Sequence, residues 1–586
     1  MAEWYLANKK CDFKAIGDEL GVDQVLVRIM RNRGYETADE MRTFLNGGDE
    51  LEHSYENLKG LDEALDILME KIDEGLPIRI IGDYDVDGIT STYILWKGLS
   101  LAGAAVDTVI PHRIRDGYGI NVDMIDEAYK AGVDTILTCD NGIAAAKAFE
   151  HAKELGLTCI VTDHHEIPYE EEGGVKHYIL PQVEAVVDPK QEDCPYPFKE
   201  ICGAVVAYKL MQGLFDALGM DTEDLKELKE LAGIATVCDV MPLVDENRYL
   251  VKNTLRSLKN ARNTGIRALV KTCELENKNI TSHSIGFVIG PCINATGRLD
   301  SADIGLELLQ SESIEEGLIK AARLKELNEA RKTMTESSQN KAREIIEAEG
   351  MLKDKVIVTY IPGMHESLAG IVAGRIREYS GKPAFILTDG EGCLKGSARS
   401  IEAYHIYEAM SEISDVFLKF GGHAMAAGFS IEKDRLEEFR RRINENCRLS
   451  EADYIERITI DVPMPMAYVT EKLVEQLSLL EPFGNGNEKP VFAQKNVSFT
   501  SVRLMGNGKM AKFAVRTPEG GPFELVLFRN LDKFSSAVDD KYGPGCWQKF
   551  TENVTDREIV MDVIYYPGIN EFRGNKNLQF VMTDYR

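Results

Sequence analysis

Ile81-Gly-Asp-Tyr-Asp-Val-Asp-Gly-Ile-Thr-Ser-Thr92 is the stretch that decides the fold. It places carboxylates at Asp83, Asp85 and Asp87, between an apolar run at 77–81 and the start of an expected helix. Acidic side chains this close repel one another unless a cation binds them. Carboxylate oxygens are suited to hard divalent ions. The stretch therefore predicts a metal-binding turn between a buried strand and a helix.

Two alternative interpretations apply to this turn. Asp83-x-Asp85-x-Asp87-Gly88 is also how an EF-hand calcium loop begins. Such a loop needs a bidentate Glu at its twelfth position, where this chain has Ile94, and it follows a helix rather than a strand. Asp is also common as a helix N-cap, but capping explains one carboxylate and not three at alternate positions.

Composition narrows the class of protein. A chain of 586 residues with 44% hydrophobic content has room for roughly three to five packed domains. The net charge of −28 argues against a generally basic nucleic-acid-coating protein, although 68 Lys and Arg allow a local basic channel. Eleven cysteines without a C-x-x-C pair indicate a reducing compartment. Residues 1–10 lack a signal-peptide core and no apolar run approaches a membrane span, so we expect a cytoplasmic protein with no membrane partner.

A β-α-β alternation runs through residues 76–190, in a domain that we expect to extend over 76–250. This rhythm predicts an α/β fold with a doubly wound parallel sheet, whose ligand site lies beyond the carboxyl ends of the strands. The expected strands are Ile78–Ile81, Val106–Pro111, Thr135–Thr138, Cys159–Thr162 and Ala185–Val187, and the expected helices include Met124–Ala131 and Ala144–Leu155.

Polar residues follow the ends of these strands. They are Asp83, Asp85 and Asp87, then Asp140-Asn141-Gly142, then Asp163-His164-His165-Glu166, and finally Asp188. Asp and His suit Mn²⁺ or Mg²⁺, and without paired cysteines a structural zinc is not expected. Asp239 lies in another apolar run, where a buried carboxylate needs a partner. A metal is one candidate partner, and Asn247 or Arg248 are the others.

Four further segments complete the predicted organisation. Residues 1–75 are expected to be helical and to pack against the next domain. Residues 251–350 form a helical connector, interrupted at 293–300 by an Asn-Ala-Thr-Gly-Arg turn. Residues 351–452 form a second α/β domain, joined to the first by long helices. Residues 453–586 carry short strands and Gly-rich turns, which predict a small β-barrel.

The second α/β domain has its own polar clusters. His365 stands just before an expected helix and Arg375 near its end. Lys395, Ser397 and Arg399 are expected on one loop. Gly421-Gly422-His423 follows, and glycines beside a histidine allow a ligand to approach the backbone closely.

In the barrel, strands are expected at 458–462, 491–492, 498–504, 513–516, 523–528, 560–566 and 578–583. Such barrels bind single strands through a basic groove and stacking aromatics. Candidates are Phe528, Arg529, Phe572, Arg573 and Lys576, with the aromatics equally suited to a core position.

Together these motifs resemble a known family. Gly82–Gly88, Asp140–Gly142, Asp163–His165 and Cys238–Val240 resemble the DHH phosphoesterases. More narrowly, the chain is similar to the RecJ single-strand-specific exonucleases from about residue 25 to the last residue, through motifs that include Ile293–Arg298, Gly396–Ser400, Gly421–His423 and Glu481–Gly484. The resemblance implies a DHH domain at 76–250, a DHH-associated domain at 351–452 and an OB-fold-like barrel at 453–586.

The resemblance also implies a site for two Mn²⁺ or Mg²⁺ ions. Its metal ligands would be Asp85 and Asp140 for one ion, and Asp87, Asp140, His164 and Asp239 for the other. Asp140 would bridge the ions, and Asp83 would support the cluster. His165 and His423 would face the scissile phosphate. Ile81 stands where related DHH pyrophosphatases have a metal-binding His, which RecJ proteins also lack.

Further positions would contact DNA or phosphate. They are Arg113, Arg298, His365, Arg375, Ser397 and Arg399. Ser397 and Arg399, with Arg113, would bind the 5′ end of the strand. From the residues alone, Arg298 is equally compatible with an ordinary surface arginine.

The implied activity is 5′→3′ degradation of single-stranded DNA to mononucleotides by two-metal-ion hydrolysis, in DNA repair and recombination. The alternative is a DHH-type phosphodiesterase of short oligonucleotides or cyclic dinucleotides, although the additional barrel favours a long polymer. A scaffold that had lost catalysis would have lost ligands, and this chain has them all. Single-strand-binding protein and a helicase are the implied protein partners, and we expect a monomer.

Overall fold

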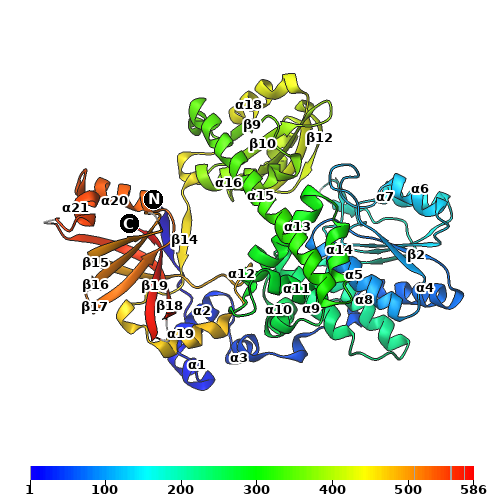
Figure 1. Cartoon of the computed structure of the whole chain (residues 1–586), viewed down its shortest axis with the longest axis horizontal. Helices are drawn as coiled ribbons and strands as arrows, with labels where there is room; N and C mark the ends of the chain where they lie inside the picture. The colour runs from blue at the N-terminus through cyan, green and yellow to red at the C-terminus, as the bar shows by residue number, and fades with distance from the viewer. Residues whose placement is uncertain (1, 174, 507, 555–556, 573–574) are drawn as a thin grey trace. The chain divides into compact units, whose positions relative to one another are not determined.

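The computed structural model describes residues 2–173, 175–506, 508–554, 557–572 and 575–586. Across these residues the chain divides into two units (Figure 1). One unit, the larger unit, comprises Gly48–Tyr454 with Gly484–Gly486. The other, the barrel unit, comprises the residues up to Gly47 together with Ile455–Phe483 and Asn487–Arg586.

A parallel sheet organises the first half of the larger unit. Its order is β3-β2-β4-β5-β8, with every neighbouring pair parallel, as predicted. The strands are β2 (Ile78–Ile81), β3 (Val106–Val109), β4 (Thr135–Cys139), β5 (Thr158–Thr162) and β8 (Ala185–Val187), and a separate antiparallel pair is β6 (Tyr169–Glu172) with β7 (Val175–Tyr178). Parallel strands covered on both faces read as continuous apolar runs, which is why they were visible in the sequence.

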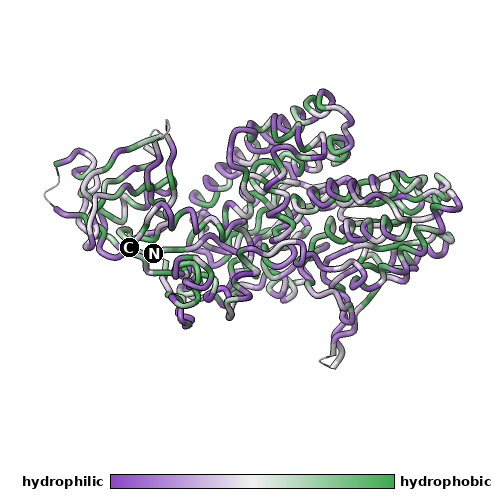
Figure 2. The backbone as a smooth tube through the Cα atoms, turned by 90° about the horizontal axis from the view of Figure 1, so that it is seen from below, coloured by the Kyte–Doolittle hydropathy of each residue, from purple (hydrophilic) through white to green (hydrophobic). Residues whose placement is uncertain are grey.

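Helices cover both faces of this sheet (Figure 1). One face packs with α4 (Leu61–Glu74), α5 (Val86–Leu101), α8 (Gly203–Ala217) and α9 (Leu225–Cys238), and the other with α6 (Val122–Lys130) and α7 (Ala146–Glu154). Neighbouring strand residues point to opposite faces, so Ile80 joins the first core and Ile81 the second. Hydrophilic and hydrophobic residues alternate along most helices, as Figure 2 shows.

A helical segment follows and differs from the prediction at one point. It contains α10 (Asp245–Ser257), α11 (Thr264–Thr272), α12 (Ser282–Ser284), α13 (Gly290–Leu299), α14 (Asp303–Leu309) and α15 (Ile314–Ala348). The expected turn at 293–300 is wrong, because these residues continue helix α13 to Leu299. Gly297 serves close packing instead, since a Cβ there would lie 2.6 Å from the carbonyl oxygen of Tyr84. In the described part of the chain, no helix, α15 included, is both long and apolar enough to cross a membrane.

The second sheet has the order β12-β13-β11-β10-β9. Its elements are β9 (Ile357–Tyr360), β10 (Ala384–Asp389), β11 (Leu394–Arg399), β12 (Phe417–Gly422) and β13 (Ala426–Ile431), with α16 (Ala369–Ser380), α17 (Ile406–Ser411) and α18 (Leu436–Glu445). Lys395, Ser397 and Arg399 lie on strand β11, not on the expected loop. Their alternate spacing puts them on one face. Arg375 lies in the middle of α16, not near its end, and is exposed.

The barrel unit contains the predicted closed barrel, in the order β15-β16-β17-β19-β18. Its elements are β15 (Phe492–Met505), β16 (Met510–Thr517), β17 (Gly520–Leu527), β18 (Ile559–Phe572) and β19 (Asn575–Tyr585), with helices α19 (Glu471–Leu477), α20 (Leu531–Tyr542) and α21 (Cys546–Thr551). Phe499, Phe513 and Phe534 pack together in its core. Phe528 is exposed. Arg573, one of the predicted strand-binding residues, lies outside the described residues.

The N-terminal segment packs differently from the prediction. Helices α1 (Phe13–Leu20), α2 (Gln24–Asn32) and α3 (Ala38–Asn46) share a hydrophobic core with the barrel, so the expected packing against the next domain holds only from Gly48 onward. Strand β1 (Glu3–Leu6) pairs in parallel with β14 (Arg457–Ile460). The strand expected at 458–462 therefore lies outside the barrel. Pairing between segments so far apart in sequence leaves no local signal.

This shared core gives a stability prediction. Leu26 on α2 is fully buried in it, so Leu26→Ala should cost about 2 to 5 kcal/mol of unfolding free energy in the barrel unit. The loss of unfolding free energy is measured by denaturant unfolding, with hydrogen exchange of the barrel amides as the probe. Leu504→Ala is the matched control, because Leu504 on β15 is 46% exposed. Equal effects of the two substitutions would contradict the packing.

Candidate active site

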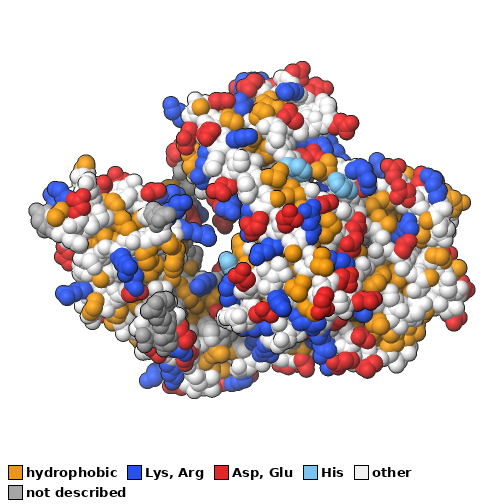
Figure 3. Space-filling model, in the orientation of Figure 1, with side chains coloured by type: hydrophobic (Ala, Val, Ile, Leu, Met, Phe, Trp, Pro, Cys, Tyr) orange, Lys and Arg blue, Asp and Glu red, His pale blue; other side chains and the backbone are white. Residues whose placement is uncertain are grey.

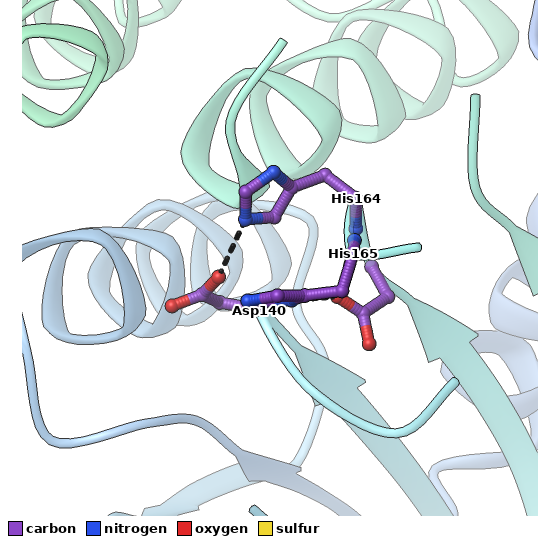
Figure 4. Close-up of side chains that lie close together, drawn as sticks. Asp140, His164 and His165 are labelled. Carbon is purple, nitrogen blue, oxygen red and sulfur yellow. Dashed lines mark hydrogen bonds and ion pairs between the residues drawn. The ribbon is translucent and has the colours of Figure 1, made fainter. Parts of the chain in front are cut away.

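Acidic side chains and one imidazole converge at the carboxyl ends of β2, β4 and β5. Asp85 caps the N-terminus of α5 by accepting from the Gly88 amide at 3.1 Å. Asp140 follows β4 with a φ of 60°, a left-handed conformation that is uncommon for a residue other than glycine. Such strained residues concentrate at functional sites. His164 follows β5, and its ring points at the Asp140 carboxylate (Figure 4).

The ligand atoms form overlapping groups, one of which combines Asp140 and His164 with Asp163 and His165. The predicted metal ligands form two more. One oxygen each of Asp83, Asp85 and Asp140 lie within 4.8 Å of one another. Asp87, His164 and Asp239 form a second group within the same limit. The two groups meet at His164, whose Nε2 lies 3.0 Å from Asp140 Oδ1, 3.5 Å from Asp87 Oδ2 and 3.7 Å from Asp239 Oδ2. The structure thus brings together all the residues predicted as metal ligands, and Asp83 with them.

Helix α8 holds Asp87 in place. The Asp87 carboxylate accepts from the backbone amides of Gly203 at 2.7 Å and Ala204 at 2.8 Å, which are the first residues of that helix. Amides at a helix N-terminus have no partner within the helix and favour a negative charge. Gly203 is required here, because a Cβ would lie 2.8 Å from the Cβ of Asp140. The helix end therefore fixes the position of the Asp87 carboxylate and leaves room for Asp140.

The charged forms of the other carboxylates in the cluster are destabilised by burial and by one another. Burial, together with the neighbouring Asp85, raises the pKa of Asp83 to about 8. Burial and the charges of Asp87 and Asp85 raise the pKa of Asp239 to about 9. The pKa of Asp140 is also raised well above its usual value, by burial and then by the charges of its neighbours. Asp83 Oδ1 and Asp239 Oδ2 are buried with no hydrogen-bond partner.

These observations test whether a metal fits. Buried oxygens without donors, in a cluster of like charges, need a cation. The donor set is carboxylate oxygen with one imidazole nitrogen, which suits Mn²⁺ or Mg²⁺. The residues present therefore fit two divalent ions, one beside each group.

His165 lies beside the cluster and is held by Asp163. Its Nδ1 is 2.7 Å from Asp163 Oδ1, and Asp163 also accepts from the backbone amides of Ile143, His164 and His165. Burial alone would lower the pKa of His165, but the hydrogen bond and charge of Asp163 raise it to about 9. His165 is thus positively charged at neutral pH and partly exposed.

Two further residues at this site were not assigned a role from the sequence. The Tyr118 hydroxyl donates to the carbonyl oxygen of Asp140 at 3.0 Å and lies 3.3 Å from the His165 ring. The Asn141 side chain donates to the carbonyl oxygens of Ile81 and Cys139 and accepts from the Ile120 amide. Asn141 thereby ties the loop that carries Tyr118 to the sheet. Asn141 could have been identified from the sequence, because it lies in the Asp140-Asn141-Gly142 turn. Nothing in the sequence around Tyr118 indicates a role for it.

A cation-lined cavity of about 500 Å³ lies in the same unit. Its walls carry Arg113, Arg298, Lys395, Ser397, Arg399 and Lys419. Arg298 donates to the carbonyl oxygen of Ser367 at 2.8 Å, and burial together with the charge of Arg113 lowers its pKa to about 9. The Arg113 guanidinium stacks 3.8 Å from the centre of the Tyr84 ring, and its buried Nε has no hydrogen-bond partner. Glu366 pairs with Lys395 at 2.8 Å.

This concentration of positive charge is a local feature. The face visible in Figure 3 mixes acidic and basic side chains instead of presenting one basic surface. Guanidinium groups that form no direct ion pair favour an anion, and their planar forks match phosphate. The cavity is therefore a candidate phosphate site.

Not every predicted binding residue lines this cavity. Arg113, Arg298, Ser397 and Arg399 do. His365 does not line it, but its Nδ1 lies 2.8 Å from the hydroxyl of Ser367, which does. Arg375 and His423 are exposed and lie outside the lining. The roles of His365, Arg375 and His423 stay predictions.

Comparison with known proteins agrees with this architecture. Residues 77–237 match the N-terminal domain of the DHH family, residues 353–449 the DHHA1 domain and residues 460–584 the RecJ OB domain. The chain is 32% identical over 581 residues to the single-stranded-DNA-specific exonuclease RecJ of Escherichia coli, covering 96% of this chain and 95% of that protein. This chain belongs to the RecJ family. The resemblance to this family that the motifs indicated is thereby confirmed.

Other RecJ proteins differ in length from this chain. It is 35% identical over 520 residues to RecJ of Bacillus subtilis, covering 88% of this chain and 64% of that protein. The RecJ structure from Thermus thermophilus in complex with Mn²⁺ superposes with a TM-score of 0.82 at 27% identity, covering 100% of this chain and 79% of that one. The same RecJ in complex with Mg²⁺ gives a TM-score of 0.76 at 26% identity, covering 100% and 78%. RecJ structures thus contain the ions that the acidic cluster fits.

The raised carboxyl pKa values predict how stability depends on pH. Asp83 and Asp239 titrate at about 8 and about 9 in the folded, metal-free protein, and at about 3.9 when unfolded. The folded state then holds protons that the unfolded state releases, so stability falls as pH rises from about 4 to about 9. The melting temperature of EDTA-treated protein should therefore decrease between about pH 6 and about pH 9.

Manganese should reverse this trend, because metal binds the deprotonated ligands. The increase in melting temperature caused by Mn²⁺ should grow with pH, and Asp239→Asn should flatten both slopes. A metal-free melting temperature that rises over the same pH range would contradict the assigned electrostatics.

Proposed function

We propose that this chain is a metal-dependent exonuclease specific for single-stranded DNA, which removes mononucleotides in the 5′→3′ direction. The single observation that carries the proposal is the shared loop at 112–120. Arg113 on this loop lines the phosphate cavity, and Tyr118 on the same loop contacts His165 and the Asp140 backbone. The loop therefore connects a phosphate-end site to a hydrolytic centre within one unit, an arrangement suited to cleavage near a strand end.

The roles of the acidic residues follow from their grouping. Asp83, Asp85 and Asp140 would hold one ion, and Asp87, His164 and Asp239 the other, with Asp140 shared. Two ions bound there supply Lewis-acid activation of a water and neutralise charge on the phosphodiester. The left-handed backbone of Asp140 and the α8 amides at Asp87 hold both groups in position before substrate arrives.

His165 would act on the scissile phosphate. Asp163 keeps its ring protonated and fixes the ring orientation, so the exposed ring nitrogen can donate to a non-bridging oxygen. Charge on that oxygen increases in the transition state, so a positioned donor lowers the barrier. Tyr118 limits the rotation of the ring from the other side.

The cation-lined cavity would bind the 5′-terminal phosphate. Arg113 and Arg399 provide the charge, Ser397 provides a hydroxyl, and Arg298 is anchored by the Ser367 carbonyl. An anchored end determines which phosphodiester reaches the metal groups, which accounts for exonuclease rather than endonuclease cleavage. His365 and Arg375 would then contact the strand outside the cavity, and His423 would face the scissile phosphate.

Long single-stranded DNA is a better candidate substrate than a short oligonucleotide. The RecJ relatives are named as single-stranded-DNA-specific exonucleases, and the match extends through the OB domain. OB barrels bind several nucleotides along a groove. A phosphodiesterase of short oligonucleotides or cyclic dinucleotides would not need that domain, so this alternative is not favoured.

The proposal extends to cellular context. Single-stranded DNA is the substrate, in repair and recombination. We propose that single-strand-binding protein and a helicase supply it, in the cytoplasm, to a monomeric enzyme. The support for these finer points is the substrate class of the RecJ relatives.

End-labelled substrate tests the reaction. With Mn²⁺ and one DNA strand labelled separately at each end, the 5′ label should leave at once as mononucleotide while the 3′ label stays in long products. Asp140→Ala should reduce release by at least about 100-fold, because it removes the carboxylate shared by both groups. Asp123→Ala, on the exposed face of α6, is the matched control. Cleavage of a dinucleotide alone, with long strands left intact, would favour the small phosphodiesterase.

A second experiment tests the cavity. Arg399→Ala should raise KM for a 5′-phosphorylated strand by about 10- to 100-fold, since one charge-assisted hydrogen bond is lost. For the same strand with a 5′-hydroxyl the change should be small. Arg441→Ala, an exposed arginine paired with Glu445 on α18, is the control. Equal losses on both strands would refute a terminal-phosphate site.

A further inference from the structure

Two cysteines face each other across neighbouring helices. Cys273 caps the C-terminus of α11 and Cys292 lies in the first turn of α13. Their Sγ atoms are 4.0 Å apart, and both residues are free thiols. Both helices pack against α15 (Figure 1). A disulfide needs the sulfurs at about 2 Å, a gap that side-chain rotation with a small helix shift closes.

The two thiols differ in access. Cys273 is partly exposed, whereas Cys292 is 1% exposed. Two lysines, Lys325 and Lys332, lie near Cys273, and Lys325 donates to the carbonyl oxygen of Thr272 at 2.9 Å. The hydrogen bond from Cys292 lowers the pKa of Cys273, burial opposes this, and the lysine charges add to the lowering. An accessible thiol with nearby cations is the type that reacts first.

We propose that Cys273 and Cys292 are a thiol-disulfide modification site, at which a small-molecule disulfide oxidises the pair to a reversible intrachain bond. The Cys273 thiolate attacks one sulfur of the oxidant, and the other oxidant sulfur leaves as a thiolate and takes up a proton. Cys292 then loses its proton to solvent and attacks Cys273 Sγ, and the second oxidant thiol is released. The two cysteines lose two electrons and two protons, and the oxidant disulfide becomes two thiols.

A series of side-chain contacts connects Cys292 to the phosphate cavity. Cys292 Sγ accepts from the Asn328 amide at 3.3 Å. Asn328 Oδ1 in turn accepts from Arg331 at 2.8 Å, and the charge of Arg331 acts on the half-buried Arg298. Moving Cys292 Sγ toward Cys273 removes the acceptor that fixes Asn328. Arg331 and helix α13, which carries Arg298, then lose their fixed positions.

Oxidation should therefore weaken binding of the DNA strand and leave the metal groups intact. This consequence rests on the proposed function, whereas formation of the bond does not. We expect KM for single-stranded DNA to rise at least several-fold on oxidation, with kcat little changed. A thiol reductant should restore the original KM.

The bond is tested first, without reference to activity. The full chain, loaded with Mn²⁺, is equilibrated with glutathione disulfide, alkylated and digested under non-reducing conditions. A peptide pair joined through Cys273 and Cys292 is expected, and it should be absent in Cys273→Ser and present in Cys393→Ser, which removes another partly exposed thiol. A stable mixed disulfide at Cys273, or no modification of Cys273, would overturn the proposal.

Activity is then measured on the same samples. The KM shift should appear in the parent and in Cys393→Ser and be absent in Cys273→Ser. An unchanged KM in protein with a fully formed Cys273–Cys292 bond would overturn the regulatory consequence. If the reduced parent cleaves no DNA, the proposed function fails, while the peptide map still decides whether the bond forms.

Discussion

Mutual repulsion among buried carboxylates is the constraint on which the larger unit, Gly48–Tyr454 with Gly484–Gly486, depends. Asp83, Asp85, Asp140 and Asp239 are pushed toward their protonated forms by burial and by one another. Such a cluster destabilises the folded protein, so we infer that it is present because of its function. Cations resolve the repulsion, and the same cations are the source of the chemistry. Stability, metal affinity and catalysis are therefore one electrostatic problem at this edge of the sheet.

The scaffold around the cluster works against this repulsion. The α8 amides hydrogen-bond to the Asp87 carboxylate, and Gly203 lets that helix end approach Asp140. Asn141 satisfies two backbone carbonyls beneath the left-handed turn at Asp140. Asp163 has enough donors to stay ionised although it is buried. These neutral or oppositely charged supports fix the positions of the acidic groups, so little reorganisation is needed when ions bind.

Much of the fold was accessible from the sequence, for identifiable reasons. The parallel strands were predicted closely, because buried apolar runs such as Ile78–Ile81 have a strong local pattern. The acidic groups were predicted because parallel strands end at one edge. The sequence did not reveal that β1 pairs with β14, or that α2 packs with the barrel, because neither contact is local. Gly297 was misinterpreted as part of a turn because its reason, close packing on Tyr84, lies outside its own segment.

The net charge of the chain restricts where a strand of DNA can bind. The chain carries −28, so a DNA polyanion is repelled on average and attracted only where positive charge is concentrated. Such charge occurs at the cavity that contains Arg113, Arg298 and Arg399, and wherever divalent ions occupy the acidic cluster. Without those ions, the cluster itself is a repulsive surface for phosphate. Metal then has two effects that act in the same direction, since it activates water and also makes the site attractive to a strand. An acidic protein with a cationic cavity is suited to the binding of a strand end that we propose.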